Sequence, residues 1–335
     1  MRFSAISSAR TAPPLQKTPF AKARVRSAEL PSSRPDKRMK RFPFLAVLAL
    51  LLAGAPAFAA SPLAVVAAEN FYGDIARQIG GREASVTSIL DNPDADPHLF
   101  EASPRAARAL AAARFVIANG LGYDPWMRRL LAAAGGSGRK VISVARLLGR
   151  RRGENPHIWY DPKTMPALAK ALAAAFERAD PAHAALYRRR LLRFEESMAP
   201  IAARIAALKS RFAGLPATAT EPVFGYMLKA LGMRIRNRRF QLAVMNNTEP
   251  GALEVAHFEN DLRRRRVRLL VYNRQVLEPM AKRMLALAKA LHIPVVAVSE
   301  TLPAGRDYQE WIASELDAVE KALATEGARI RNHAR

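Results

Sequence analysis

The sequence predicts an α/β protein of two lobes, each with a parallel sheet flanked by helices, joined by one long rigid spine helix. Three observations predict this fold. Short apolar runs of strand length alternate with amphipathic runs at helical spacing, which is typical of βαβ units and parallel sheets. In the middle of the chain, apolar and charged residues keep helical spacing over residues 180–212. The alternation of strands and helices then begins again and continues almost to the C-terminus.

The first 59 residues are predicted to lie outside the fold. Residues 1–38 are rich in Arg, Ser and Pro and show no periodicity. Met39 directly precedes a short basic head, an apolar run and the small-x-small pattern Ala-Phe-Ala at 57–59, which together are typical of a secretory signal peptide. The apolar run is too short for a convincing membrane span. We therefore expect translation to start at Met39 and the cleaved protein to be periplasmic and not membrane-spanning.

The first lobe is predicted to span residues 60–178. Its helices carry boundary signals. Ser103 and Asp124 each stand directly before a proline, which is typical of an N-cap followed by the first helical residue. A Gly pair at 80–81 ends the first helix. Short apolar runs with Val and Ile mark the strands between them. The expected strands are 63–68, 84–90, 114–120 and 140–144, and the expected helices are 70–81, 103–113, 124–136 and 161–180.

The spine helix is predicted within residues 179–213, with Asp180 as its N-cap and Pro181 as its first helical residue. With a rise of 1.5 Å per residue it would be about 48 Å long, which is longer than a small lobe is wide. The second lobe, residues 214–335, repeats the pattern of the first. Its expected strands are 217–220, 239–245, 267–273 and 293–299, and its expected helices are 221–232, 249–266, 277–292 and 307–323.

Composition and missing motifs exclude several function classes. The chain has no cysteine, which excludes a disulfide scaffold, a thiolate metal site, a catalytic Cys and a lipid anchor on an N-terminal Cys. It also has no Gly-rich phosphate loop and no Gly-x-Ser-x-Gly elbow. The formal net charge is +24, but the arginines are spread over the chain and few aromatic residues interleave with them. We interpret this charge as a solvated basic surface and expect no nucleic-acid binding.

Four side chains that can bind metal stand at predicted loop positions, two in each lobe. His98 and His157 each follow a proline in the first lobe, and Glu221 and Glu300 each directly follow a predicted strand in the second. Because ligands of parallel α/β sheets bind at the carboxyl ends of strands, a mouth between the lobes would bring all four together. Two imidazoles and two carboxylates suit a borderline divalent ion such as Zn²⁺ or Mn²⁺. The spacing alone leaves open whether the four form one site.

Five stretches of the sequence, in order, resemble the metal-binding (cluster A-I) family of periplasmic solute-binding proteins, which serve ABC importers of zinc or manganese. The resemblance runs from about residue 62 to residue 325. It implies two α/β lobes joined by one long helix, with the metal between the lobes on four ligands. The stretches are "NPDADPHLFEASP", "IANGLGYDPWMRRLL", "NPHIWYDP", "TEPVFGYMLKALG" and "VVAVSETLPAGRDYQEWI".

The resemblance assigns the ligands position by position. His98 matches the histidine of the DPH motif and His157 that of the PHxW motif. Glu221 matches the third ligand, which is His in many zinc-specific members and Glu in many manganese-type members. Glu300 falls where the family has an acidic ligand, usually Asp. The resemblance therefore implies a monomeric protein, not an enzyme, that binds Zn²⁺ first and Mn²⁺ second and delivers the ion to an ABC permease in the inner membrane.

Two other functions stay open from the residues alone. A secreted zinc-dependent hydrolase would need an open coordination position and a nearby general base, as in HExxH, and that motif is absent. A basic envelope protein that binds anionic polymers through its arginines would keep its function after loss of all four candidate ligands.

The resemblance leaves one feature of zinc-specific members unmatched. Many of them carry a His-rich acidic loop in the first lobe, whereas no histidine lies between Trp126 and His157 in this sequence.

Overall fold

The computed structural model describes residues 61–93, 100, 103–135, 138–275 and 278–333. The predicted extension and signal peptide at 1–59 lie outside the described residues, as does His98. Residues 60–335 form a compact unit of their own. In the described part of this unit, no helix is both long and apolar enough to cross a membrane.

The first sheet has four parallel strands in the order β2-β1-β3-β4. All four predicted strands are present, with boundaries shifted by a few residues. The strands are β1 (Leu63–Glu69), β2 (Ala84–Leu90), β3 (Phe115–Ala118) and β4 (Lys140–Ser143). Its helices are α2 (Asn70–Gly80), α3 (Pro104–Ala112), α4 (Pro125–Ala133), α5 (Val144–Leu147) and α6 (Thr164–Ala179).

The second sheet repeats this topology with the parallel order β6-β5-β7-β8. Parallel sheets covered by helices in both lobes confirm the predicted fold class. The strands are β5 (Pro216–Ala219), β6 (Arg234–Ile235), β7 (Leu269–Asn273) and β8 (Val295–Val298). The helices are α8 (Gly225–Ala230), α9 (Arg238–Met245), α10 (Ala252–Arg263), α11 (Pro279–Ala290) and α12 (Tyr308–His333).

The strand predicted at 239–245 is wrong, because this segment forms helix α9. Phe240 and Val244, four residues apart, are buried, whereas Leu242 between them is 43% exposed. A strand would place all three on one face, and a helix separates them. The sheet's edge strand is instead the two-residue β6, which ends at Ile235, two residues before Asn237, whose backbone is in the left-handed region.

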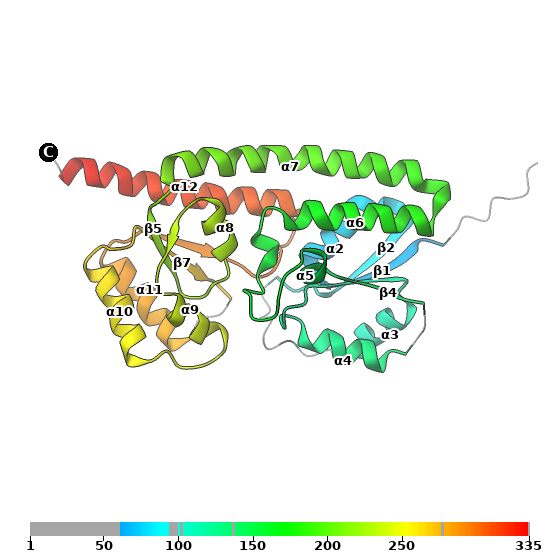
Figure 1. The fold of residues 1–335 in the computed structure, drawn as a ribbon, viewed down its shortest axis with the longest axis horizontal. Coiled ribbons are helices and arrows are strands. Elements are labelled where there is room, and N and C mark those ends of the chain that lie inside the picture. The colour runs from blue at the N-terminus through cyan, green and yellow to red at the C-terminus, as the bar shows by residue number, and fades with distance from the viewer. Residues whose placement is uncertain (1–60, 94–99, 101–102, 136–137, 276–277, 334–335) are drawn as a thin grey trace, which may run out of the picture. The chain divides into compact units, whose positions relative to one another are not determined.

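The predicted spine helix is present as α7 (Ala184–Phe212), preceded by a 3-10 turn at Pro181–His183. With 29 residues it is about 44 Å long, and it continues through Pro200. Its buried residues recur every three, four or seven positions and form one apolar stripe. Figure 1 shows α7 running beside α12, to which Arg204 is tied by an ion pair with Asp317 at 2.7 Å. One hydrophobic core then runs through both lobes.

Both sheets reverse their strand order at a central pair of strands. From β1 the chain goes to β2 on one side and β3 on the other, and β5 stands in the same relation to β6 and β7. In open α/β sheets the crevice at the carboxyl ends of such a pair is the preferred ligand site. Glu69 ends β1 and Asn119 follows β3, while Glu221 lies just beyond β5 and Asn273 ends β7.

Candidate metal centre

His157 is fixed in one orientation by Asn155, which precedes it by two residues. The Asn155 Oδ1 atom accepts from the His157 backbone N–H at 3.1 Å and lies 2.6 Å from the His157 Nδ1 atom. The Asn155 Nδ2 atom donates to the carbonyl of Pro222 at 2.7 Å, which fixes which end of the amide faces the imidazole. Because an amide oxygen only accepts, the Nδ1 atom carries the proton. The neutral ring therefore has its lone pair on Nε2.

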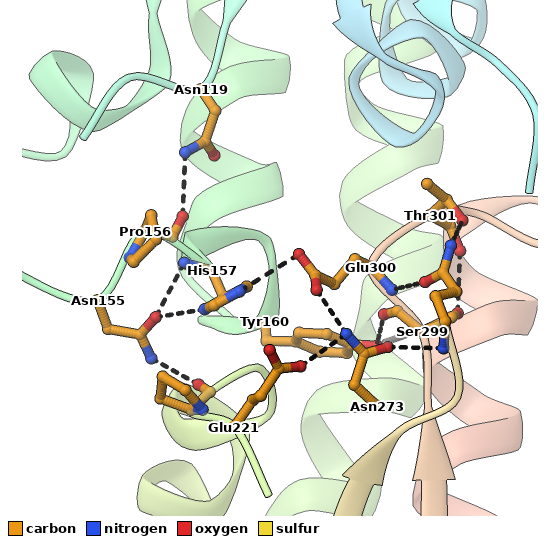
Figure 2. Close-up of polar contacts among 12 residues, drawn as sticks. Asn119, Asn155, Pro156, His157, Tyr160, Glu221, Asn273, Ser299, Glu300 and Thr301 are labelled. Carbon is orange, nitrogen blue, oxygen red and sulfur yellow. Dashed lines mark hydrogen bonds and ion pairs between the residues drawn. The ribbon is translucent and has the colours of Figure 1, made fainter. Parts of the chain in front are cut away.

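The His157 Nε2 atom faces the Glu300 carboxylate (Figure 2). It lies 3.4 Å from the Glu300 Oε2 atom, and the two side chains are 1% and 0% exposed. Nε2 has no hydrogen-bond partner among the described residues. A lone pair and a carboxylate oxygen repel in a buried site unless a proton or a metal ion lies between them. Two ligands at about 2.05 Å from a tetrahedral ion are about 3.3 Å apart, which is close to the observed separation.

Glu221 joins this pair through Asn273 (Figure 2). The Asn273 Nδ2 atom donates to the Glu221 Oε2 atom at 2.8 Å and to the Glu300 Oε1 atom at 2.6 Å. All three side chains are buried. One amide group thus holds two carboxylates side by side at the carboxyl edge of the second sheet.

Of the four predicted ligands, His157 lies beside Glu300, and Asn273 bonds Glu300 and Glu221. His98 lies outside the described residues. Within the described ranges, no three His, Asp or Glu side chains approach closely enough to hold a metal ion by themselves. The ligand set therefore stays a prediction.

Residues from the first sheet support the loop that carries His157. Asn119 donates through Nδ2 to the carbonyl of Pro156 at 3.0 Å, and Tyr72 donates its hydroxyl to the Asn119 Oδ1 atom at 2.6 Å. Tyr123 packs edge-on against the His157 ring, with ring centroids 5.9 Å apart. These contacts fix the height of the imidazole above the first sheet, so the ring position depends on residues far from it in sequence.

The sequence analysis missed Asn273 and Asn119. Both follow or end a strand, as Glu221 and Glu300 do, so the strand-end rule could have found them. Neither residue type suggests metal binding by itself, and an asparagine at a strand end is common in turns.

Glu315, a buried residue of α12, is linked by hydrogen bonds to the loop that carries Glu300. The Glu315 Oε1 atom accepts from the hydroxyl of Tyr160 at 2.9 Å and from the Trp311 Nε1 atom at 2.9 Å. Tyr160 also donates to the carbonyl of Ser299, the residue before Glu300. Burial raises the pKa of Glu315 to about 8, although the hydrogen bonds from Tyr160, Trp311 and the Ser299 backbone lower it in part.

Glu315→Gln is expected to make the free energy of unfolding less dependent on pH between about 4.5 and 8. The folded protein binds the Glu315 proton up to about pH 8, whereas the unfolded chain releases it near the ordinary value of 4.5. The free energy of unfolding therefore falls as pH rises between these values and levels off above them. Between pH 5 and pH 9 the parent should lose on the order of 3 kcal/mol more than the variant, measured by urea unfolding. Glu196→Gln, on the exposed side of α7, serves as control and should behave like the parent.

Three comparisons place the chain among known proteins. The sequence model of the family described as zinc-uptake complex component A, periplasmic (ZnuA), matches residues 65–322. The manganese-binding lipoprotein MntA of Bacillus subtilis is 28% identical over 144 residues, which cover 41% of this chain and 46% of MntA. The structure of the periplasmic zinc-binding protein TroA of Treponema pallidum matches with TM-score 0.65 and 18% identity, over 78% of this chain and 99% of TroA.

A further solved structure, the solute-binding protein FpvC of Pseudomonas aeruginosa in complex with Mn²⁺, matches with TM-score 0.67 and 17% identity. It aligns with 79% of this chain and 99% of its own. At these identities the structural matches show the fold. The two-lobed fold of this chain is thus similar to that of these two metal-binding proteins.

The chain belongs to the family of zinc-uptake complex component A. Members of this family are metal-binding solute-binding proteins and not enzymes, which removes the hydrolase alternative.

Proposed function

We propose that this protein binds one divalent transition-metal ion in the periplasm and delivers it to an ABC permease of the inner membrane for import. The ligands are His98, His157, Glu221 and Glu300. The single observation that carries this proposal is the buried approach of the His157 Nε2 atom to the Glu300 carboxylate at 3.4 Å, with Glu221 held beside it by Asn273. The protein acts as a monomer after its signal peptide is removed, and the ion is its cargo.

The donor set suits both Zn²⁺ and Mn²⁺. Imidazole nitrogen favours zinc, and the family model that matches the chain is one of zinc uptake. A second carboxylate suits manganese, and MntA and FpvC are both named with manganese. We propose Zn²⁺ as the first cargo and Mn²⁺ as the second, because two imidazoles bind zinc well and two carboxylates neutralise the charge of either ion.

Metal uptake by cells tests this function. Cells that lack this gene should take up less radioactive zinc or manganese from a metal-poor medium, and the wild-type gene should restore uptake. The gene with His157→Ala should restore none. Normal uptake in the deleted cells for both ions, with no other importer active, would contradict delivery to a permease.

A further inference from the structure

Glu69 is a buried acidic residue that the four-ligand set does not include. It is the last residue of β1 and is 0% exposed. Neither oxygen of its carboxyl group has a hydrogen-bond partner in the described part of the chain. Burial raises the pKa of Glu69 well above its ordinary value, Asp124 raises it further, and only the Glu69 backbone amide opposes them. A buried carboxylate without a counter-charge is costly, so this position is stable only with a proton or a cation nearby.

Glu69 occupies the place in the first sheet that Glu221 occupies in the second. In each sheet, continuing the observed register of the two central strands by two residues sets a glutamate level with an asparagine: Glu69 with Asn119, and Glu221 with Asn273. The two pairs differ in their bonds. Asn273 donates to Glu221, whereas Asn119 donates to the carbonyls of Gly120 and Pro156. The first sheet thus presents a carboxylate at its ligand-binding edge without the amide that balances the one in the second sheet.

Tyr123 connects Glu69 to the metal centre. Burial raises the pKa of Tyr123, and the charges of Glu300 and Glu69 raise it further, so both carboxyl groups act on the same side chain. The ring of Tyr123 also packs against His157. The Tyr123 side chain, which packs on His157, thus feels the charges of both Glu69 and Glu300.

We propose that Glu69 is a further acidic residue of the metal centre, whose buried negative charge strengthens the binding of a divalent cation from the side of the first sheet. The inference rests on the proposed function. A divalent ion near His157 supplies the positive charge that Glu69 lacks, and the interaction is strong because Glu69 and His157 are both buried. Glu69 acts on the ion through its charge, and it affects affinity without changing the number of ions bound.

Glu69→Gln tests this proposal, because glutamine keeps the size of the side chain and removes its charge. Zn²⁺ and Mn²⁺ are titrated separately into metal-free parent and variant by calorimetry with a competing chelator. The variant should still bind one ion, with affinity about tenfold weaker or more, and metal should raise its melting temperature less than it raises that of the parent. Glu69→Met, which is apolar and of similar length, should show the same loss. Glu69→Asp, which keeps the charge, should retain more affinity than either.

Asp261→Asn is the matched control. It removes a buried carboxylate charge, but this carboxylate pairs with Arg236 on the second lobe at 2.7 Å. It should lower the melting temperature of the metal-free protein and leave metal affinity within about twofold. Equal affinity in the parent, Glu69→Gln and Glu69→Met would overturn the role of Glu69 while leaving the proposed function intact. Absence of metal binding by the parent would overturn both.

Discussion

His157→Ala should abolish high-affinity metal binding, with a loss in affinity of more than about 100-fold. Replacing a residue that only orients a ligand typically costs 10–100-fold, and His157 is itself a proposed ligand. Its Nε2 atom is the one proposed nitrogen donor among the described residues, and alanine removes it from beside the Glu300 carboxylate. The measurement is a titration of Zn²⁺ and Mn²⁺ in the presence of a chelator of known affinity.

His257→Ala is the control for this prediction. His257 lies on α10 and is exposed, so the substitution removes an imidazole without changing the site. It should bind metal as the parent does. Unchanged affinity in His157→Ala, with a native circular dichroism spectrum, would show that His157 is no ligand.

Asn273→Leu should weaken metal binding by about 10–100-fold and destabilise the metal-free protein by about 2 kcal/mol. Leucine has nearly the shape of asparagine but cannot donate to Glu221 and Glu300, so both buried carboxylates lose a hydrogen bond at once. Without the amide they also repel each other more strongly. Urea unfolding measures the stability, and chelator competition measures the affinity.

Asn260→Leu makes the same chemical change on α10 without removing a hydrogen bond to either carboxylate. Its metal affinity should equal that of the parent. If Asn273→Leu retained both parent stability and parent affinity, the amide would not organise the two carboxylates, and the arrangement drawn in Figure 2 would have no role in binding.

Most of the fold follows from local patterns. Strand-length apolar runs are short-range signals that predicted seven of the strands. Helical spacing and the Asp180-Pro181 start signal predicted the long helix α7, which itself begins at Ala184 after the 3-10 turn at Pro181–His183. The segment at 239–245 was mispredicted because apolar residues at alternating positions in seven residues fit a strand as well as a short helix. Only the pattern of buried side chains in this segment distinguishes a helix from a strand, and that pattern depends on the rest of the lobe.

The site was less accessible to sequence reasoning than the fold. His157, Glu221 and Glu300 were predicted as ligands because they stand in family motifs and at loop or strand-end positions, although the spacing between them makes no local pattern. Asn273 and Glu69 were not found, since an amide and a glutamate at a strand end have many ordinary roles. Their significance depends on the register of the central strands, which joins residues fifty or more positions apart.

A titration of the metal-free protein with Zn²⁺ and with Mn²⁺ tests metal capture most directly, with His98→Ala alongside. The parent should bind one ion per chain tightly, and the variant should lose that site, since His98 is the proposed ligand outside the described residues. The ion bound more tightly would identify the cargo. No stoichiometric binding of either ion by the parent would contradict metal capture, and the arginine-rich surface would then become the leading clue to function.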